Sequence, residues 1–163
     1  VPLSNMQEAD LLVMLELVKE RNIPLRFIEL MPLSCNSELQ GLSGEAIRSK
    51  LAEAGMQLLK VESTLGNGPA VYYQAEGYAG AIGFIEPLHN KFCASCNRIR
   101  LTATGLLKPC LYANETFDLK ALLRSDASDE EILEALRHAI YAKPQGHAFE
   151  ISPANFPMNA IGG

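Results

Sequence analysis

The 163-residue sequence is 48% hydrophobic and carries a formal net charge of −5. This length suits one domain, or one domain with a piece of another, and the apolar fraction argues against a disordered chain. The negative charge argues against a general nucleic-acid binder. The sequence contains neither an apolar run of membrane-spanning length nor a secretory leader, so we expect a cytoplasmic protein without a membrane partner.

The chain opens with a pattern that predicts a helix followed by a buried strand. Apolar residues recur at helical spacing over residues 4–21, and the apolar run 23–31 ends at Pro32. A helix followed by a strand is the closing half of an α/β unit. We therefore expect residues 1–33 to be the last part of an incomplete α/β barrel, in a chain that begins at Val1 as a fragment or a processed protein.

The rest of the sequence, residues 34–163, predicts short strands and helices without a regular alternation. Asp118 is expected to cap a short helix, and Ser128 with Glu131 to form the capping box of a second one. Residues 142–163 read as an extended tail. The fold class is therefore α+β, ending in a C-terminal domain with a small antiparallel sheet. The other expected elements are a helix over 43–54 and strands near 56–62, 70–74 and 81–85.

Three of the four cysteines are clustered. Cys93 and Cys96 form a C-x2-C step, and Cys110 follows after thirteen residues. Without a secretory signal the thiols stay reduced, and clustered reduced cysteines favour a metal over disulfides. Cys35 lies far upstream and is expected to be an ordinary thiol.

A β-hairpin can bring the third cysteine back to the first two. Residues 98–102 alternate as a strand, and Gly105 can take the left-handed position of a three-residue loop. Pairing Thr102 with Leu106 then fixes the register of the returning strand.

In this register Cys110 lies opposite Arg98. Because side chains alternate between the two faces of a strand, four of them share one face: Cys96, Arg98, Arg100 and Cys110. Ile99 and Leu101 are expected to point into the core. Two arginines about 7 Å apart on one face suit a polyphosphate or another extended anion.

Three thiolates fit two kinds of metal centre. A four-iron cluster that has only three cysteines leaves one iron open for an outside ligand. Structural zinc usually takes four ligands, and the fourth could come from His89, His147 or Cys35. On spacing alone both readings stay open. The second would make the chain a zinc-stabilised interaction module whose arginines bind an anionic partner.

The cysteine segment also carries a resemblance. Residues 92–105 read FCASCNRIRLTATG, and Pro-Cys-Leu follows at 109–111. This pattern resembles the GTP 3′,8-cyclase family, the radical S-adenosylmethionine enzymes that start molybdenum cofactor biosynthesis. The resemblance extends over essentially the whole chain, through the segments RFIELMP (26–32), GPAVYY (68–73), IGFI (82–85), KPQGH (143–147) and IGG (161–163).

The resemblance implies two 4Fe-4S clusters that face one cavity. The first binds S-adenosylmethionine and generates a 5′-deoxyadenosyl radical, which takes a hydrogen from the ribose of GTP before cyclisation to a pterin precursor. By position, Cys93, Cys96 and Cys110 resemble the ligands of the second cluster, whose open iron binds GTP.

Further contacts are implied by position. The residues that resemble GTP contacts are Arg98, Ile99, Arg100 and Arg26. Met31 resembles an S-adenosylmethionine contact, and Gly162 with Gly163 resembles a catalytic tail that enters the active site. On sequence alone, a core position for Met31 and an ion pair for Arg26 stay open.

One feature of the family is missing. The radical-generating C-x3-C-x2-C motif, which belongs near the start of the full protein, does not occur in this sequence. We therefore expect this chain to be inactive alone and to hold the second cluster and GTP together with the missing N-terminal part. A homodimer stays open.

Overall fold

The computed structural model describes residues 1–33, 38–62 and 65–149. The chain folds as two units. Unit 1 contains Val1–Met31 and the described residues of Glu38–Phe92, and unit 2 contains Pro32, Leu33 and the described residues from Cys93 onward.

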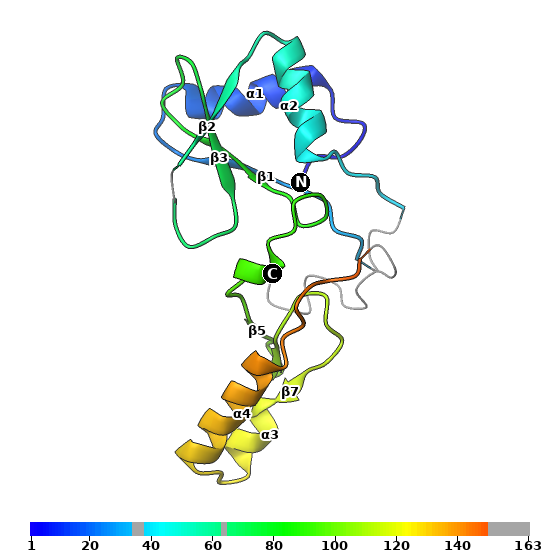
Figure 1. Ribbon diagram of the computed structural model, residues 1–163, viewed down its shortest axis with the longest axis vertical. Coiled ribbons are helices and arrows are strands. Elements are labelled where there is room, and N and C mark those ends of the chain that lie inside the picture. The colour runs from blue at the N-terminus through cyan, green and yellow to red at the C-terminus, as the bar shows by residue number, and fades with distance from the viewer. Residues whose placement is uncertain (34–37, 63–64, 150–163) are drawn as a thin grey trace. The chain divides into compact units, whose positions relative to one another are not determined.

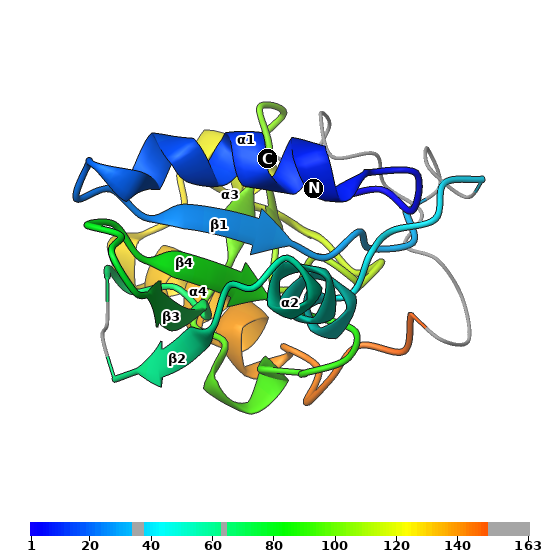
Figure 2. The same ribbon diagram turned by 90° about the horizontal axis from the view of Figure 1, so that it is seen from above.

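Unit 1 (Figure 1) is built on a four-stranded mixed sheet, whose strand order β1-β4-β3-β2 is seen in Figure 2. β1 pairs with β4 in parallel, and the other two pairings are antiparallel. A parallel pair needs a crossover connection, and α2, β2 and β3 lie between β1 and β4 in the sequence. The strands are β1 (Leu25–Ile28), β2 (Leu58–Val61), β3 (Val71–Ala75) and β4 (Ile82–Ile85).

Two helices pack on this sheet and form its core. Apolar side chains three or four residues apart make one buried face on α1 (Glu8–Lys19) and another on α2 (Gly44–Glu53). Figure 2 shows α1 running alongside β1. The core joins both helices to three strands through Leu11, Leu15, Val18, Phe27, Ile47, Leu51, Ala75, Ile82 and Phe84.

Unit 2 contains the cysteine hairpin and a pair of helices. Its antiparallel sheet has the order β5-β6-β7, and α3 and α4 lie side by side (Figure 1). Asp118 caps α3 by accepting from the Ala121 amide at 2.8 Å, and Ser128 with Glu131 forms the capping box of α4. The elements are β5 (Arg100–Leu101), β6 (Leu106–Lys108), β7 (Phe117–Asp118), α3 (Leu119–Arg124) and α4 (Asp129–Tyr141).

The structure confirms the α+β class, with a mixed and an antiparallel sheet. A barrel remnant, and a domain boundary at residues 33/34, stay predictions. No helix in the described residues is long and apolar enough to cross a bilayer.

The predicted burial of Ile99 and Leu101 was wrong. Their exposed fractions are 44% and 59%, whereas Leu107, paired with Leu101, is 3% exposed. β5 is the edge strand of its sheet, and α3 packs on the central strand β6 instead. Alternation along a strand identifies a face, but it does not say whether that face is covered.

Candidate functional site

The hairpin that carries the cysteines has the predicted register. Arg100 pairs with Lys108. At the loop, the Thr102 amide donates to the Leu106 carbonyl at 2.9 Å, and the Leu106 amide donates to Thr102 Oγ1 at 3.0 Å. Gly105 has a φ of +87°, the left-handed conformation that the three-residue loop requires. The paired strands end at Arg100 and Lys108, and Pro109 lies in a bend, so the position of Cys110 opposite Arg98 stays a prediction.

Cys93 and Cys96 lie on a tight turn that precedes β5. A 3-10 turn spans Cys93–Ser95, and the Cys96 amide donates to the Cys93 carbonyl at 3.2 Å. Cys93, Cys96 and Cys110 are reduced thiols of intermediate exposure. Such thiols are accessible to an incoming metal.

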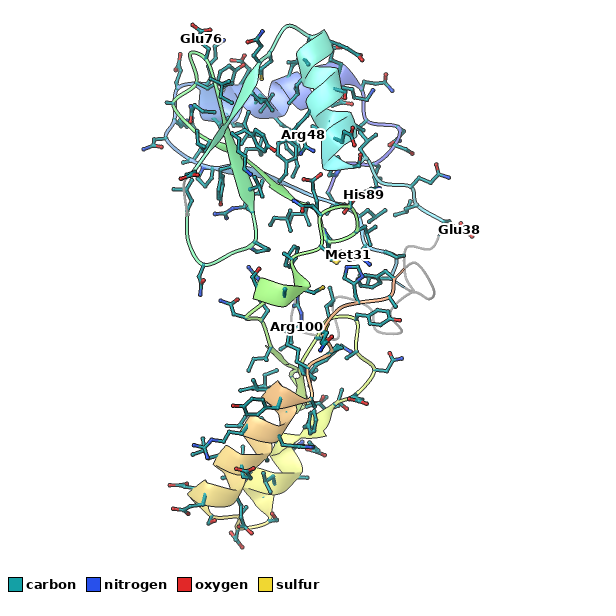
Figure 3. The ribbon with its side chains drawn as sticks, in the orientation of Figure 1. Met31, Glu38, Arg48, Glu76, His89 and Arg100 are labelled. Atoms are coloured by element: carbon teal, nitrogen blue, oxygen red, sulfur yellow. The ribbon has the colours of Figure 1, made fainter. Side chains whose placement is uncertain are left out.

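Arg100 is the first residue of β5, the strand that follows the cysteine turn (Figure 3). It lies within electrostatic reach of the Cys96 and Cys110 sulfurs, and both raise its pKa. Burial, the largest effect, and repulsion from Arg98 outweigh them and lower the pKa of Arg100. The structure therefore brings Arg100, Cys96 and Cys110 together on the hairpin.

The Cys96 thiol has a cationic environment. Burial alone would raise its pKa and is the largest single effect. A hydrogen bond from the Arg98 backbone and the nearby ammonium of Lys143 outweigh burial and lower the pKa below its ordinary value. The Lys143 Nζ lies 3.3 Å from Cys96 Sγ. This environment favours the thiolate, which is the form that binds metals.

Lys108 is a site neighbour that our sequence reasoning missed. Its side chain is fully buried, and its Nζ donates to the Ala113 carbonyl. Burial is the largest cause that lowers the pKa of Lys108, the charge of Arg100 lowers it further, and Cys110 raises it. The alternation that grouped Arg100 with Cys110 also places Lys108 on that face, so the signal was present in the sequence.

Arg26 lies in unit 1, on the face of the sheet opposite the core phenylalanines. Its Nε donates to the Tyr72 hydroxyl at 2.6 Å, and its guanidinium donates to the Leu65 carbonyl at 3.0 Å. Gly83 of β4 pairs with Arg26 on one side and with Tyr72 on the other. A Cβ at this position would lie 2.8 Å from the Tyr72 ring. The contacts shown for Arg26 are thus a hydroxyl and a carbonyl, in place of the ion pair that the sequence left open.

Two buried carboxylates organise the end of this sheet. Glu29 accepts from the Leu88 amide at 2.8 Å and from the ring of His89, which makes His89 a hydrogen-bonded surface histidine. Glu86 pairs with Arg48 at 3.2 Å, and Arg48 also points over the Phe84 ring at 4.9 Å (Figure 3). Sequence reasoning missed both carboxylates, because each finds its partner far along the chain.

The remaining predicted residues fall in different places. Met31 is partly buried, three residues beyond the end of β1. His147 packs against the Phe149 ring with the centroids 4.7 Å apart. The tail glycines, Gly162 and Gly163, lie outside the described residues, as does Cys35.

The three cysteine thiols can be judged against the needs of a zinc ion and of a four-iron cluster. Within residues 1–33, 38–62 and 65–149, no group of three or more His, Cys, Asp or Glu side chains could hold a metal ion. A four-iron cluster binds each thiolate through a different iron, so its ligands need not converge on one point. Three reduced thiols with lysine and arginine beside two of them fit that cluster chemistry.

Comparison with known proteins shows the family. Residues 23–149 match the family described as Molybdenum Cofactor Synthesis C. The chain belongs to this family. The matched region of the Molybdenum Cofactor Synthesis C family includes both units' sheets, the cysteine hairpin and the lysines beside it.

Curated relatives agree with the family match. The chain is 40% identical over 147 residues to a GTP 3′,8-cyclase of Thermodesulfovibrio yellowstonii, which covers 89% of this chain and 45% of the relative. It is 45% identical over 138 residues to the enzyme of that name from Desulforamulus reducens, covering 82% and 42%. The chain therefore spans less than half the length of these relatives, and it corresponds to their C-terminal part.

Proposed function

We propose that the chain is the C-terminal, substrate-binding part of a GTP 3′,8-cyclase in molybdenum cofactor biosynthesis. In this proposal Cys93, Cys96 and Cys110 hold a 4Fe-4S cluster. The observation that carries it is the hairpin register, which puts Arg100 within electrostatic reach of Cys96 and Cys110. When bound, the cluster supplies an open iron at which a purine nucleotide can coordinate.

The arginines of the hairpin bind the triphosphate in this account. Arg98 lies two residues before Arg100, the first residue of β5, and in extended backbone this separation is about 7 Å, which matches neighbouring phosphates. Guanidinium groups donate in pairs to phosphate oxygens, which orients the nucleotide as well as binding it. Ile99 is exposed between them and offers an apolar contact to the same ligand.

Four other residues have proposed roles in substrate binding, cofactor binding or catalysis. Arg26, whose Nε donates to the Tyr72 hydroxyl, is a further proposed GTP contact. Met31 contacts S-adenosylmethionine, which the N-terminal part supplies together with the radical. Gly162 and Gly163 enter the active site as a tail without side chains. In this proposal the chain is inactive alone, and a homodimer stays a prediction.

The proposal is tested by anaerobic reconstitution of the chain with iron and sulfide. We expect the unmodified chain to bind about four irons and Cys110→Ala to form no cluster. In Arg100→Met, GTP binding should weaken about 10-fold or more, because a charge-assisted contact is removed. ATP serves as the nucleotide control. Stoichiometric zinc in folded protein, with no cluster and no response to GTP, would favour the zinc-stabilised interaction module instead.

A further inference from the structure

Lys143 is held at the end of α4 by the helix itself. The Ala142 amide donates to the His138 carbonyl at 2.9 Å, and the Lys143 amide donates to the Ile140 carbonyl at 3.2 Å. Pro144 follows and cannot continue the helix, since it has no amide hydrogen. These hydrogen bonds hold the backbone of Lys143 against the last turn of α4 and so define the position from which its side chain extends.

The ammonium of Lys143 reaches the cysteine turn 47 residues earlier in the sequence. Its Nζ lies 2.6 Å from the Cys96 carbonyl oxygen, 2.8 Å from the Arg98 carbonyl oxygen and 3.3 Å from Cys96 Sγ. An ammonium has three N–H donors, and these three acceptors use all of them. Carbonyls two residues apart point to the same side of an extended segment, and the Cys96 and Arg98 carbonyls that share this ammonium are two residues apart.

We propose that Lys143 is a positioning residue that holds the C-x2-C turn and the following arginine segment in the conformation that receives the cluster. The proposal rests on the proposed function only where it concerns the cluster. The contacts of Lys143 with Cys96 and Arg98 are present in the chain without a cluster.

The same geometry excludes a simpler role. A lysine near two arginines suggests a third phosphate contact, but a phosphate oxygen could bind Lys143 only by displacing one of the Cys96 or Arg98 acceptors. The side chain is also only partly exposed. Lys143 thus acts through the cysteine turn and is not itself a phosphate contact.

The hydrogen bond from Lys143 Nζ to Cys96 Sγ should also affect the reduction potential of a bound cluster. Hydrogen bonds to the ligand sulfurs are among the factors that set the reduction potential of an iron–sulfur cluster. A positive charge beside a thiolate ligand stabilises the more negative, reduced form. Removing this donor should therefore shift the potential to more negative values, an effect that a purely structural lysine would not produce.

The test uses three variants of the full 163-residue chain. Lys143→Met keeps the length of the side chain and removes the charge and the donors, Lys143→Arg keeps a charge and donors, and Lys120→Met is the control at an exposed lysine of α3. Hydrogen exchange is measured on the cluster-free proteins. Iron per chain and reduction potential are measured after anaerobic reconstitution.

We expect the amides of residues 93–100 to exchange about 10-fold faster in Lys143→Met, because the variant loses hydrogen bonds to a charged group. The amides of α4 should stay as protected as in the unmodified chain. Lys143→Met should also bind less iron, and any cluster that forms should have a more negative potential. Lys143→Arg should restore part of both, and Lys120→Met should match the unmodified chain.

Two results would overturn the proposal. One is unchanged exchange in residues 93–100 of Lys143→Met. The other is an equal loss of protection throughout β6, α3 and α4, which would make Lys143 a general stabiliser of unit 2. If the unmodified chain takes up no iron, the proposed function fails, but the exchange measurement still decides whether Lys143 holds the turn.

Discussion

At the scale of single residues, the cationic environment of Cys96 is the feature with the clearest chemical consequence. Lys143 and the Arg98 backbone lower the pKa of this thiol despite its burial. A depressed pKa means that the thiolate is favoured in the folded chain, so this contribution to stability is present above the ordinary thiol pKa. It is lost as the pH falls through the lowered value.

The pH dependence of alkylation tests this directly. In the cluster-free chain, the rate at which iodoacetamide modifies Cys96 should reach half its maximum at a pH below that of an ordinary thiol. Lys143→Met should move the midpoint upward, because both the hydrogen bond and the charge are removed. The modified peptide is followed by mass spectrometry. A midpoint at or above the ordinary value would contradict this electrostatic account.

Gly83 is a second residue whose identity is set by its neighbours. A Cβ at this position would lie 2.8 Å from the Tyr72 ring and 3.3 Å from Arg26 Cγ. We expect Gly83→Ala to lower the free energy of unfolding by about 1–3 kcal/mol, the cost of overpacking, in chemical denaturation. Gly146→Ala, where a Cβ would meet nothing within 4 Å, is the control. Equal stability of the two variants would disprove this packing argument.

At the scale of elements, the hairpin loop depends on Gly105 for two separate reasons. Its φ is +87°, and a Cβ there would lie 2.5 Å from Lys120 Cβ at the start of α3. Gly66 has the same φ of +87° but nothing within 4 Å of its Cβ position. The two glycines therefore separate backbone strain from steric conflict.

Alanine at each glycine measures the two costs. Gly66→Ala should destabilise the chain by about 1 kcal/mol, from the left-handed conformation alone. Gly105→Ala should cost about 1–3 kcal/mol more and should also reduce iron uptake, since shifting the loop moves Cys110. Chemical denaturation and iron analysis of both variants give the comparison. Similar losses for the two variants would show that the contact with α3 has no energetic weight.

Local patterns predicted most of the elements, and the exceptions have physical causes. The first helix was expected over residues 4–21, but α1 begins at Glu8, where Gln7 and Asp10 form a capping box. The register of the hairpin followed from the loop length and Gly105. The exposure of Ile99 and Leu101 could not be predicted, because it depends on where α3 packs.

At the scale of the whole molecule, each unit has contacts between residues that are far apart in the sequence. Lys143 reaches Cys96 over 47 residues, and Glu29 accepts from Leu88 over 59. Such pairs leave no periodic signal, so the cysteines and arginines were predicted from one short segment and the lysine beside Cys96 was not. The sequence therefore identified candidate site residues along one segment, but not the long-range contacts that position them.

The family match covers residues 23–149, from just before β1 in unit 1 to Phe149 beyond α4 in unit 2. The matched region therefore includes residues of both units. The chain spans less than half the length of its curated relatives, and we propose that cyclase activity requires residues outside this chain. Addition of an N-terminal part that carries the radical-generating motif is expected to be necessary for product formation. Product formed by this chain alone would contradict that expectation.

The measurement that tests the central claim most directly is a titration of the reconstituted chain with GTP, followed by ⁵⁷Fe Mössbauer spectroscopy. A nucleotide bound at an open iron should change the signal of one iron in four, and Arg100→Met should require more GTP for the same change. A cluster whose spectrum is unaffected by saturating GTP would contradict the claim that these three cysteines and two arginines form one substrate site.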